Sequence, residues 1–369
     1  MSLNKQETTS PALIIGEIGV NHNGDLDTAI RLVDAAADAG ADLVKFQTFN
    51  TMQIVTRSAR KAEYQIRNMG GEDNNQMAML QALELDQPSH RVLIEHCQAR
   101  QVGFLSTPFD FDSAKFLIDE LGLKQIKVGS GDMSNAPHLL FLAQRGVDVI
   151  LSTGMATMHE TSIAMGALAF GYLGRKDKPS PAAFIESLTD PRGCELLARK
   201  TTVMHCTSNY PAPFDEINLA VMETLRKEYP CQIGFSDHSE GYAVAVAAVA
   251  LGARMLEKHL TLDRKQPGPD HWASIEPSTF RDMVQAIREV ERAVGSPDKI
   301  PTASEIATKA VARKSLVAAT SIPAGEAFNE SNLAIKRPGT GMAPELFWGL
   351  LGRKASRDYE PDDLISEPE

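Results

Sequence analysis

The run Leu13-Ile14-Ile15-Gly16-Glu17 decides the fold, because a short apolar segment stops there at a carboxylate and the arrangement recurs along the chain. The later runs lead to Lys45 and Gln47, to Ser106 and Thr107, to Lys127 and Ser130, to Ser152, to His205, to Ser236, Asp237 and His238, and to Glu257, Lys258 and His259. Segments with helical periodicity separate most of them, such as Asp27 to Ala39, which Gly40 ends. This alternation predicts an α/β protein, a (β/α)8 TIM barrel whose polar residues gather at the carboxyl ends of its parallel strands.

The chain of 369 residues is too long for a barrel alone. We expect the barrel over 1–297, a linker over 298–310 and a small β-rich domain over 311–369, where short strand-like runs alternate with Pro-Gly turns. Two segments interrupt the barrel rhythm. Residues 50–87 are a candidate lid, and residues 173–200 are an excursion or extended helix between the fifth and sixth strands.

Composition excludes several classes of function. The net charge is −11 without a basic run, which argues against a nucleic-acid partner. The longest apolar stretch, 243–252, covers about half a bilayer, so we expect no membrane span. The four cysteines form no CxxC pair and the N-terminus lacks the features of a signal peptide. We therefore expect a cytoplasmic protein with reduced thiols.

Two histidines end the seventh and eighth strand runs. Adjacent parallel strands lie about 4.8 Å apart, so His238 and His259 could hold one metal ion between them. Two imidazoles with water or carboxylate suit Mn²⁺ or a similar ion. The alternative is a pair of buried, hydrogen-bonded histidines without a metal. We expect His22 and His205 to be structural.

Two lysines lie inside apolar strand runs, where a charge is costly unless it meets a partner. Lys45 and Lys127 are therefore either salt-bridged to Glu17 or Asp132, or form a cation clamp for phosphate and carboxylate. Hydroxyl donors to the same anion would come from Thr107, Ser130, Ser152 and Ser236. Each serine by itself fits a turn better than an anion contact, and it is their agreement at several strand ends that favours an anion site.

Two carboxylates complete the candidate site. Glu17 either pairs with a lysine or handles a proton in the reaction. Asp270 follows Pro267-Gly268-Pro269, where it either binds a substrate or caps a turn.

These residues stand in motifs that resemble the sialic acid synthases. The motifs are Gly16-Glu17-Ile18-Gly19-Val20-Asn21-His22-Asn23-Gly24, Val44-Lys45-Phe46-Gln47-Thr48-Phe49, Ser106-Thr107-Pro108-Phe109, Lys127-Val128-Gly129-Ser130-Gly131, Ser152-Thr153-Gly154-Met155, His205-Cys206-Thr207, Gly234-Phe235-Ser236-Asp237-His238-Ser239, Glu257-Lys258-His259 and Gly268-Pro269-Asp270. The tail from Val311, with Lys336-Arg337-Pro338-Gly339-Thr340-Gly341, resembles that family's antifreeze-like SAF domain, a β-clip fold.

The resemblance implies a transferase. It would condense phosphoenolpyruvate with an open-chain N-acylated mannosamine-type sugar, N-acetylmannosamine in the first instance, to give N-acetylneuraminate and phosphate with C–O cleavage. His238 and His259 would hold a divalent metal, most simply Mn²⁺, with Mg²⁺ or Co²⁺ as alternatives. Lys45, Thr107, Lys127, Ser130, Ser152, Ser208 and Ser236 would bind phosphoenolpyruvate, and Glu17 would act near its C2. Gln47, Asp132, Tyr210 and Asp270 would bind the sugar. Arg337 would reach the N-acyl group from a partner, in a domain-swapped homodimer.

Some positions depart from the family pattern. Asp132 stands where many members have Glu, and either Ser208 or Asn209 takes the place of an asparagine. A legionaminic acid synthase acting on a 2,4-diacetamido-trideoxy-mannose is the main alternative. A Schiff-base nonulosonate lyase using Lys45 or Lys127 is a second one. A non-enzymatic ice- or carbohydrate-binding protein is a third.

Overall fold

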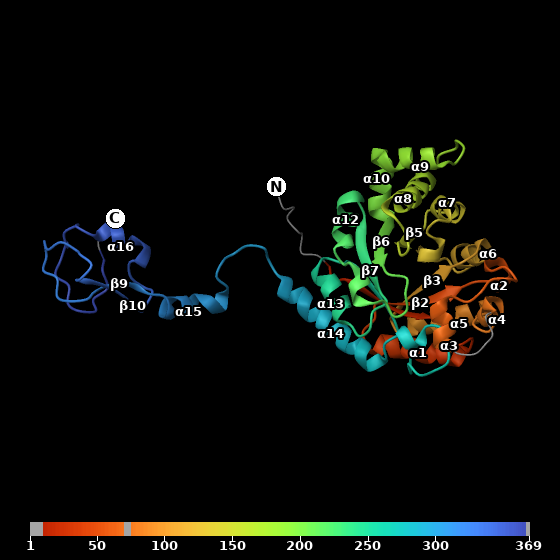
Figure 1. The fold of residues 1–369 in the computed structure, drawn as a ribbon, viewed down its shortest axis with the longest axis horizontal. Coiled ribbons are helices and arrows are strands. Elements are labelled where there is room, and N and C mark those ends of the chain that lie inside the picture. Colours follow the sequence, from red (N-terminus) through yellow and green to blue (C-terminus); the bar gives the residue numbers. More distant parts are fainter. Residues whose placement is uncertain (1–9, 70–74, 367–369) are drawn as a thin grey trace. The chain divides into compact units, whose positions relative to one another are not determined.

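The computed structural model describes residues 10–69 and 75–366. The chain divides into two compact units, one ending at Gly295 and one beginning at Ser296 (Figure 1). The expectation about a signal peptide concerns residues 1–9, which lie outside the described residues. Among the helices described, none is both long and apolar enough to cross a membrane.

Eight parallel strands form the first unit, as the sequence predicted. They are β1 (Leu13–Gly19), β2 (Leu43–Thr48), β3 (Gly103–Pro108), β4 (Gln125–Val128), β5 (Asp148–Ser152), β6 (Thr201–Cys206), β7 (Gln232–Asp237) and β8 (Met255–His259). Hydrogen-bonded ladders connect them in the order β3-β2-β1-β8-β7-β6-β5-β4. The end strands β3 and β4 pack beside each other, so the sheet curves into a near-closed barrel of the TIM type.

Helices connect these strands on the outside of the barrel. They are α1 (Leu26–Asp38), α2 (Thr51–Ile54), α3 (Glu63–Met69), α4 (Gln76–Gln81), α5 (Gln87–Ala99), α6 (Phe111–Lys115), the π-helix η1 (Phe116–Glu120), the 3₁₀ turn η2 (Ser130–Asp132), α7 (Ala136–Gln144), α8 (Met158–Tyr172), α9 (Pro181–Thr189), α10 (Pro191–Lys200), α11 (Phe214–Ile217), α12 (Val221–Glu228), α13 (Ala243–Ala250), the 3₁₀ turn η3 (His271–Ala273) and α14 (Pro277–Val294). The segment 173–200 is thus mainly the helices α9 and α10, and the segment 50–87 contains α2, α3 and α4.

Local sequence explains why these helices form where they do. The side chain of Asp25 accepts hydrogen bonds from the first-turn N–H groups of α1, which satisfies donors that the helix itself leaves free. Ala29, Leu32, Val33 and Ala36 form the buried stripe of that helix. Gly40 then takes φ +89°, a conformation that side-chain-bearing residues rarely adopt.

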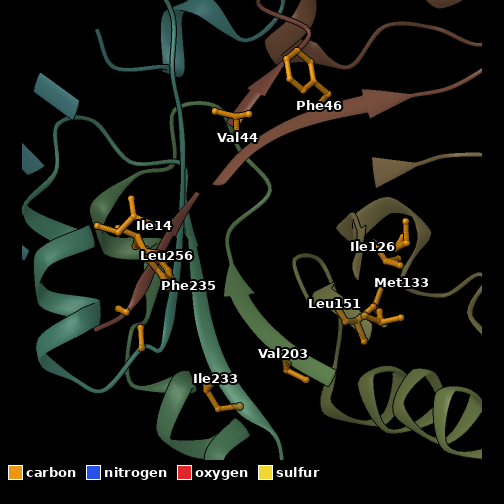
Figure 2. Packing of buried hydrophobic residues seen from close by; sticks show 14 of the residues in the cluster. Ile14, Val44, Phe46, Ile126, Met133, Leu151, Val203, Ile233, Phe235 and Leu256 are labelled. Carbon is orange, nitrogen blue, oxygen red and sulfur yellow. The ribbon is translucent and has the colours of Figure 1, made fainter. Parts of the chain in front are cut away.

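Side chains alternate between two cores along each strand. Ile14, Val44, Ile126, Leu151, Val203, Ile233 and Leu256 belong to the core between the sheet and its helices (Figure 2). Ile15, Leu105, Ile150, Met204 and Met255 form a separate core inside the barrel. Because strand side chains alternate with a period of two, the next inward positions after this inner layer carry polar residues at the strands' carboxyl ends.

The second unit is a small domain with its own core. It begins with α15 (Ala303–Ala312), so the segment 298–310 that the sequence assigns to a linker contains most of this helix. The strands β9 (Ser315–Ala318) and β10 (Leu333–Lys336) pair antiparallel, and η4 (Pro344–Leu346) and α16 (Phe347–Leu350) follow. Leu316, Ile322, Phe328 and Tyr359 pack at the centre of the domain.

Candidate active site

One cavity of about 760 Å³ opens at the carboxyl ends of the barrel strands. All the site residues that the sequence predicted within the first unit line it: Glu17, Lys45, Gln47, Thr107, Lys127, Ser130, Asp132, Ser152, Ser208, Tyr210, Ser236, His238, His259 and Asp270. His22 and His205 do not line it. The ring of His205 instead contacts the carbonyl oxygen of Ile217 at 2.6 Å. The cavity has the size typical of a small-molecule site.

Strand register brings two carboxylates and two lysines together at the floor of this cavity. Glu17 lies opposite Lys45 in the β1–β2 ladder, and Lys45 Nζ lies 2.8 Å from Glu17 Oε2. Glu257 lies 3.7 Å from both Lys45 Nζ and Lys127 Nζ. All four side chains are buried. The two lysines and two carboxylates therefore lie close enough to compensate one another's charge, which makes their burial tolerable.

The same charges separate the pKa values of the two carboxylates. Burial raises the pKa of Glu17 to about 7, against the attraction of Lys45. Burial also acts on Glu257, but Lys127 and Lys45 outweigh it and lower the pKa of that carboxyl to about 2. Glu17 can therefore take up and release a proton near neutral pH, whereas Glu257 remains a fixed negative charge between the lysines.

Hydroxyl groups extend the two lysines into an anion-binding surface. Lys45 Nζ donates to Thr107 Oγ1 at 3.3 Å, and Lys127 Nζ donates to Ser152 Oγ at 2.7 Å. Ser130 Oγ accepts a hydrogen bond from the Gly154 N–H at 3.0 Å. Ammonium, hydroxyl and backbone N–H donors that converge in this way suit a phosphate or carboxylate group.

His238 and His259 meet at the neighbouring ends of β7 and β8. Their ring centroids lie 5.6 Å apart. His238 Nδ1 donates to the Thr207 carbonyl oxygen at 2.7 Å, which leaves the lone pair on Nε2. The hydroxyl of Ser236 donates its hydrogen bond to Glu257 Oε1 at 2.8 Å and therefore does not donate to His238 Nε2. His259 Nδ1 is buried with no hydrogen-bond partner in the described part of the chain.

These two imidazoles fit a divalent metal. Burial lowers the pKa of His238 to about 4, and burial together with His238 lowers that of His259 well below its usual value. Both rings are therefore neutral, the form that binds metal. Within residues 10–69 and 75–366, no group of three His, Cys, Asp or Glu side chains could hold a metal ion. The remaining coordination positions would therefore fall to water or substrate.

Further polar groups line the same cavity, and one of them contacts the histidines directly. The Tyr210 ring stacks on His238 with centroids 4.2 Å apart. Gln47 Nε2 lies 3.5 Å from Glu17 Oε1, and Asn135 Nδ2 lies 3.4 Å from Asp132 Oδ1. Asp270 precedes η3 but its side chain does not cap that turn, so the turn-capping alternative is wrong. These groups are placed to contact a polyol or an amide.

We expect Asp270 to make folding stability pH-dependent. Burial raises the pKa of this carboxyl to about 6. Between about pH 4 and 6 the folded state binds more protons than the unfolded state, so the contribution of Asp270 to stability falls as pH rises through this window. Asp270→Asn removes the effect. The free energy of unfolding of Asp270→Asn minus that of the wild type should be roughly 1–2 kcal/mol larger at pH 8 than at pH 5.

Denaturant unfolding of the wild type and Asp270→Asn at both pH values measures this difference. A gain that is the same at pH 5 and pH 8 would contradict the assignment of Asp270 as a buried, unpaired carboxyl.

The structure confirms part of the salt-bridge alternative and adds a residue that the sequence interpretation missed. Of the partners expected for the two lysines, Glu17 does pair with Lys45, but Asp132 pairs with neither lysine among the described residues, and the carboxylate neighbour of Lys127 is Glu257. The reason is strand alternation: Glu257 lies two positions before His259, so both point into the barrel, while Lys258 between them points outward to Asp237 at 2.9 Å. This period of two was the signal that could have identified Glu257. Of Ser208 and Asn209, Ser208 lines the cavity.

Arg337 belongs to the second unit. Its Nε donates to the Ala312 carbonyl oxygen at 3.0 Å, and the neighbouring Gly339 N–H donates to Ala310 O at 2.8 Å. The turn that carries Arg337 is thus fixed to the carboxyl end of α15. No residue of α15 is buried, and its apolar residues Ile306 and Val311 are 61% and 70% exposed.

Comparison with known proteins gives matches to both units. A model described as the NeuB family matches residues 32–299, and a model described as the SAF domain matches residues 313–369. The chain is 41% identical to N,N'-diacetyllegionaminic acid synthase of Campylobacter jejuni, over 96% of this chain and 99% of the relative. It is 35% identical to human N-acetylneuraminate-9-phosphate synthase, over 97% of this chain and 92% of the relative.

A solved structure supports the same relationship. The crystal structure of an N-acetylneuraminic acid synthetase from Leptospira borgpetersenii matches with a TM-score of 0.65 and 30% identity, covering 84% of this chain and 94% of that one. The similarity therefore extends over the barrel and the small domain of the chain, and the proteins that it resembles are named as synthases of legionaminic acid and N-acetylneuraminate derivatives.

Proposed function

The chain belongs to the NeuB family, and on that premise we propose that it condenses phosphoenolpyruvate with the open-chain aldehyde of an N-acylated mannosamine-type sugar. The products would be a nonulosonic acid and inorganic phosphate. The four free cysteines, Cys97, Cys194, Cys206 and Cys231, are consistent with a reaction in the cytoplasm.

The observation that carries this proposal is the meeting of two lysines, several hydroxyls and two neutral imidazoles in one cavity. Lys45 and Lys127 with Thr107, Ser130, Ser152, Ser208 and Ser236 would bind the phosphate and carboxylate of phosphoenolpyruvate. His238 and His259 lie beside this anion site, where the aldehyde would meet the reactive carbon. An arrangement that holds both reactants side by side lowers the entropic cost of joining them.

In the proposed reaction, the C2–C3 double bond of phosphoenolpyruvate opens as C3 bonds to the aldehyde carbon, the aldehyde C=O double bond opens and its oxygen takes up a proton, and water adds at C2. The bond from C2 to the phosphate oxygen then breaks, so phosphate leaves with that oxygen. Glu17 would accept the proton that the water loses, a role suited to a carboxyl whose pKa is raised to about 7. A divalent metal, Mn²⁺ in the first instance, would supply Lewis acidity toward the aldehyde oxygen when held by His238 and His259.

Gln47, Asp132, Tyr210 and Asp270, which line the same cavity, would orient the sugar. Two acceptors of the proposed class are candidates. N-Acetylmannosamine would give N-acetylneuraminate, and a 2,4-diacetamido-trideoxy-mannose would give a legionaminic acid. The relative of 41% identity, named for diacetyllegionaminic acid, favours the second candidate.

We also propose that the site is completed by a second copy of the chain. The apolar residues of α15 are exposed, as expected for a helix that docks on another surface. The turn fixed to its end carries Arg337, which would hold the N-acyl group in the partner's barrel. The functional unit would then be a domain-swapped homodimer.

A phosphate-release assay tests the proposed function. With phosphoenolpyruvate, Mn²⁺ and a panel of 2-acetamido and 2,4-diacetamido sugars, phosphate should appear only when both substrates are present. A Schiff-base lyase would instead split a nonulosonic acid to pyruvate, and borohydride with pyruvate would attach a label to Lys45 or Lys127. Borohydride trapping without phosphate release would replace our proposal by the lyase.

Lys127→Ala should weaken the binding of phosphoenolpyruvate. A charge-assisted hydrogen bond to an anion contributes about 1.5–3 kcal/mol, which corresponds to roughly tenfold or more in affinity. The KM for phosphoenolpyruvate should rise accordingly, while the KM for the sugar changes less. An increase confined to the KM of the sugar would contradict the assignment of Lys127 to the anion site.

A further inference from the structure

One wall of the cavity is apolar and has no part in the chemistry assigned above. Phe49, Met79, Leu80, Leu83 and Val20 line it, and we call this set the apolar chamber. Four of them are at least nine-tenths buried and pack as a cluster separate from the barrel cores, with Leu80 against it. Most of the chamber comes from the segment 50–87 after β2, which the sequence predicted as a candidate lid.

The polar residues that the segment 50–87 contributes to the cavity are neutral amides. Gln53, Gln65 and Gln76 line the cavity beside it, and the described lining residues of this segment include no charged side chain. Gln65 Oε1 accepts from the Ala62 N–H at 2.8 Å, and Gln53 Nε2 donates to Asp112 at 2.9 Å. Gln76 is half-buried and makes no side-chain hydrogen bond among the described residues.

The segment also reaches across the cavity to the loop that carries Asp270. Asn68 Nδ2 of α3 donates to the Pro269 carbonyl oxygen at 2.7 Å. The chamber and the sugar-facing carboxylate therefore border the same space. The lysines and hydroxyls on the barrel floor would hold phosphoenolpyruvate, and the aldehyde of the acceptor would point toward it. The other end of the acceptor would then lie against this apolar wall.

Resting on the proposed function, we propose that the apolar chamber receives the far end of the acceptor and selects a 6-deoxy sugar with a second acylamido group over a sugar with free hydroxyls. The C6 methyl and the acyl methyl would contact Met79, Leu80 and Leu83. The amide of the second acylamido group would meet the amide of Gln76.

The physical reason is the unequal cost of burying a methyl and a hydroxyl group. A methyl group gains free energy when it leaves water for an apolar surface. A hydroxyl at the same place loses its water partners and finds no acceptor or donor in this wall, which is costly. Together, these effects favour the deoxygenated sugar by about tenfold or more, the range that one small group produces in an apolar pocket.

Three acceptors that differ in single steps test this inference. They are N-acetylmannosamine, its 6-deoxy analogue and 2,4-diacetamido-2,4,6-trideoxy-mannose, each assayed by phosphate release with phosphoenolpyruvate and Mn²⁺. In the wild type, kcat/KM should rise along this series, by about tenfold or more overall. In Met79→Gln and in Leu80→Gln this preference should largely disappear, while the KM for phosphoenolpyruvate stays within about twofold of wild type.

The matched control is Met52→Gln, the same chemical change as Met79→Gln in the same segment. Met52 is 57% exposed and does not line the cavity, so its variant should keep the wild-type preference. Leu80 is only partly buried, so its variant serves if Met79→Gln fails to fold in a thermal melt.

The outcomes separate this inference from the function on which it rests. Phosphate release at equal kcat/KM for all three sugars would leave the synthase standing and overturn the role of the chamber. A wild-type preference that both folded chamber variants retain would overturn it as well. No phosphate release with any sugar would instead be a failure of the proposed function.

Discussion

Replacing His238 or His259 by alanine should abolish turnover while the barrel stays folded. Each change removes one of the two neutral imidazoles, whose ring centroids lie 5.6 Å apart. The bound metal and its Lewis acidity would be lost, an effect worth several kcal/mol or roughly a thousandfold in rate. Activity, metal content after dialysis and a thermal melt of each variant measure the three parts of this expectation.

A matched histidine and a chelator provide the controls. His96 lies on α5, pairs with Asp34 and does not line the cavity, so His96→Ala should keep its metal and its activity. EDTA should inactivate the wild type, and Mn²⁺ should restore it. Full activity of the wild type in metal-free buffer would contradict the assignment of these histidines as metal ligands.

The second large effect concerns the domain that carries Arg337. Deleting residues from Val311 onward should leave a folded barrel with little activity, because the sugar would lose its N-acyl contact. A hybrid dimer tests whether that contact comes from a partner. Neither Arg337→Ala nor His238→Ala alone should turn over efficiently. Their heterodimer should recover about half of the wild-type activity, because exchange leaves one of its two sites intact.

Recovery of activity in the heterodimer distinguishes between exchanged and unexchanged small domains. In the hybrid, the barrel with a normal His238 receives a normal Arg337 only if the small domains serve each other's barrels. A purified heterodimer that shows no recovery would mean that each small domain serves its own barrel or none.

Much of the site was predictable from the sequence because the direction of a side chain in a strand depends only on nearby residues. A side chain's direction in a strand follows from its position in a two-residue alternation, and parallel strands bring their carboxyl ends together. Lys45, Ser152, His238 and His259 could therefore be placed in one cavity from the sequence. Glu257 follows the same rule: it lies two positions before His259 and points inward, whereas Lys258 between them points outward to Asp237.

Other features depend on contacts between distant parts of the chain. The two-residue period shows that Glu257 points inward, but not which lysine it meets: Asp132 follows β4 directly in the turn η2, whereas Glu257 lies on β8 and comes near Lys127 through the curvature of the barrel. The segment 50–87 is largely polar along the sequence. Its role as a cavity wall comes from Met79, Leu80 and Leu83, whose burial depends on packing against Phe49 and Val20. Such tertiary packing leaves no periodic signal in a short helix.

The most direct measurement of the central claim follows the bridging oxygen of phosphoenolpyruvate. With ¹⁸O between C2 and phosphorus and with an N-acylated mannosamine-type acceptor, the account predicts one labelled phosphate for each nonulosonic acid formed. The product's C2 oxygen should then come from water. Label retained in the sugar acid, or pyruvate formed without a condensed product, would contradict condensation by C–O cleavage in this cavity.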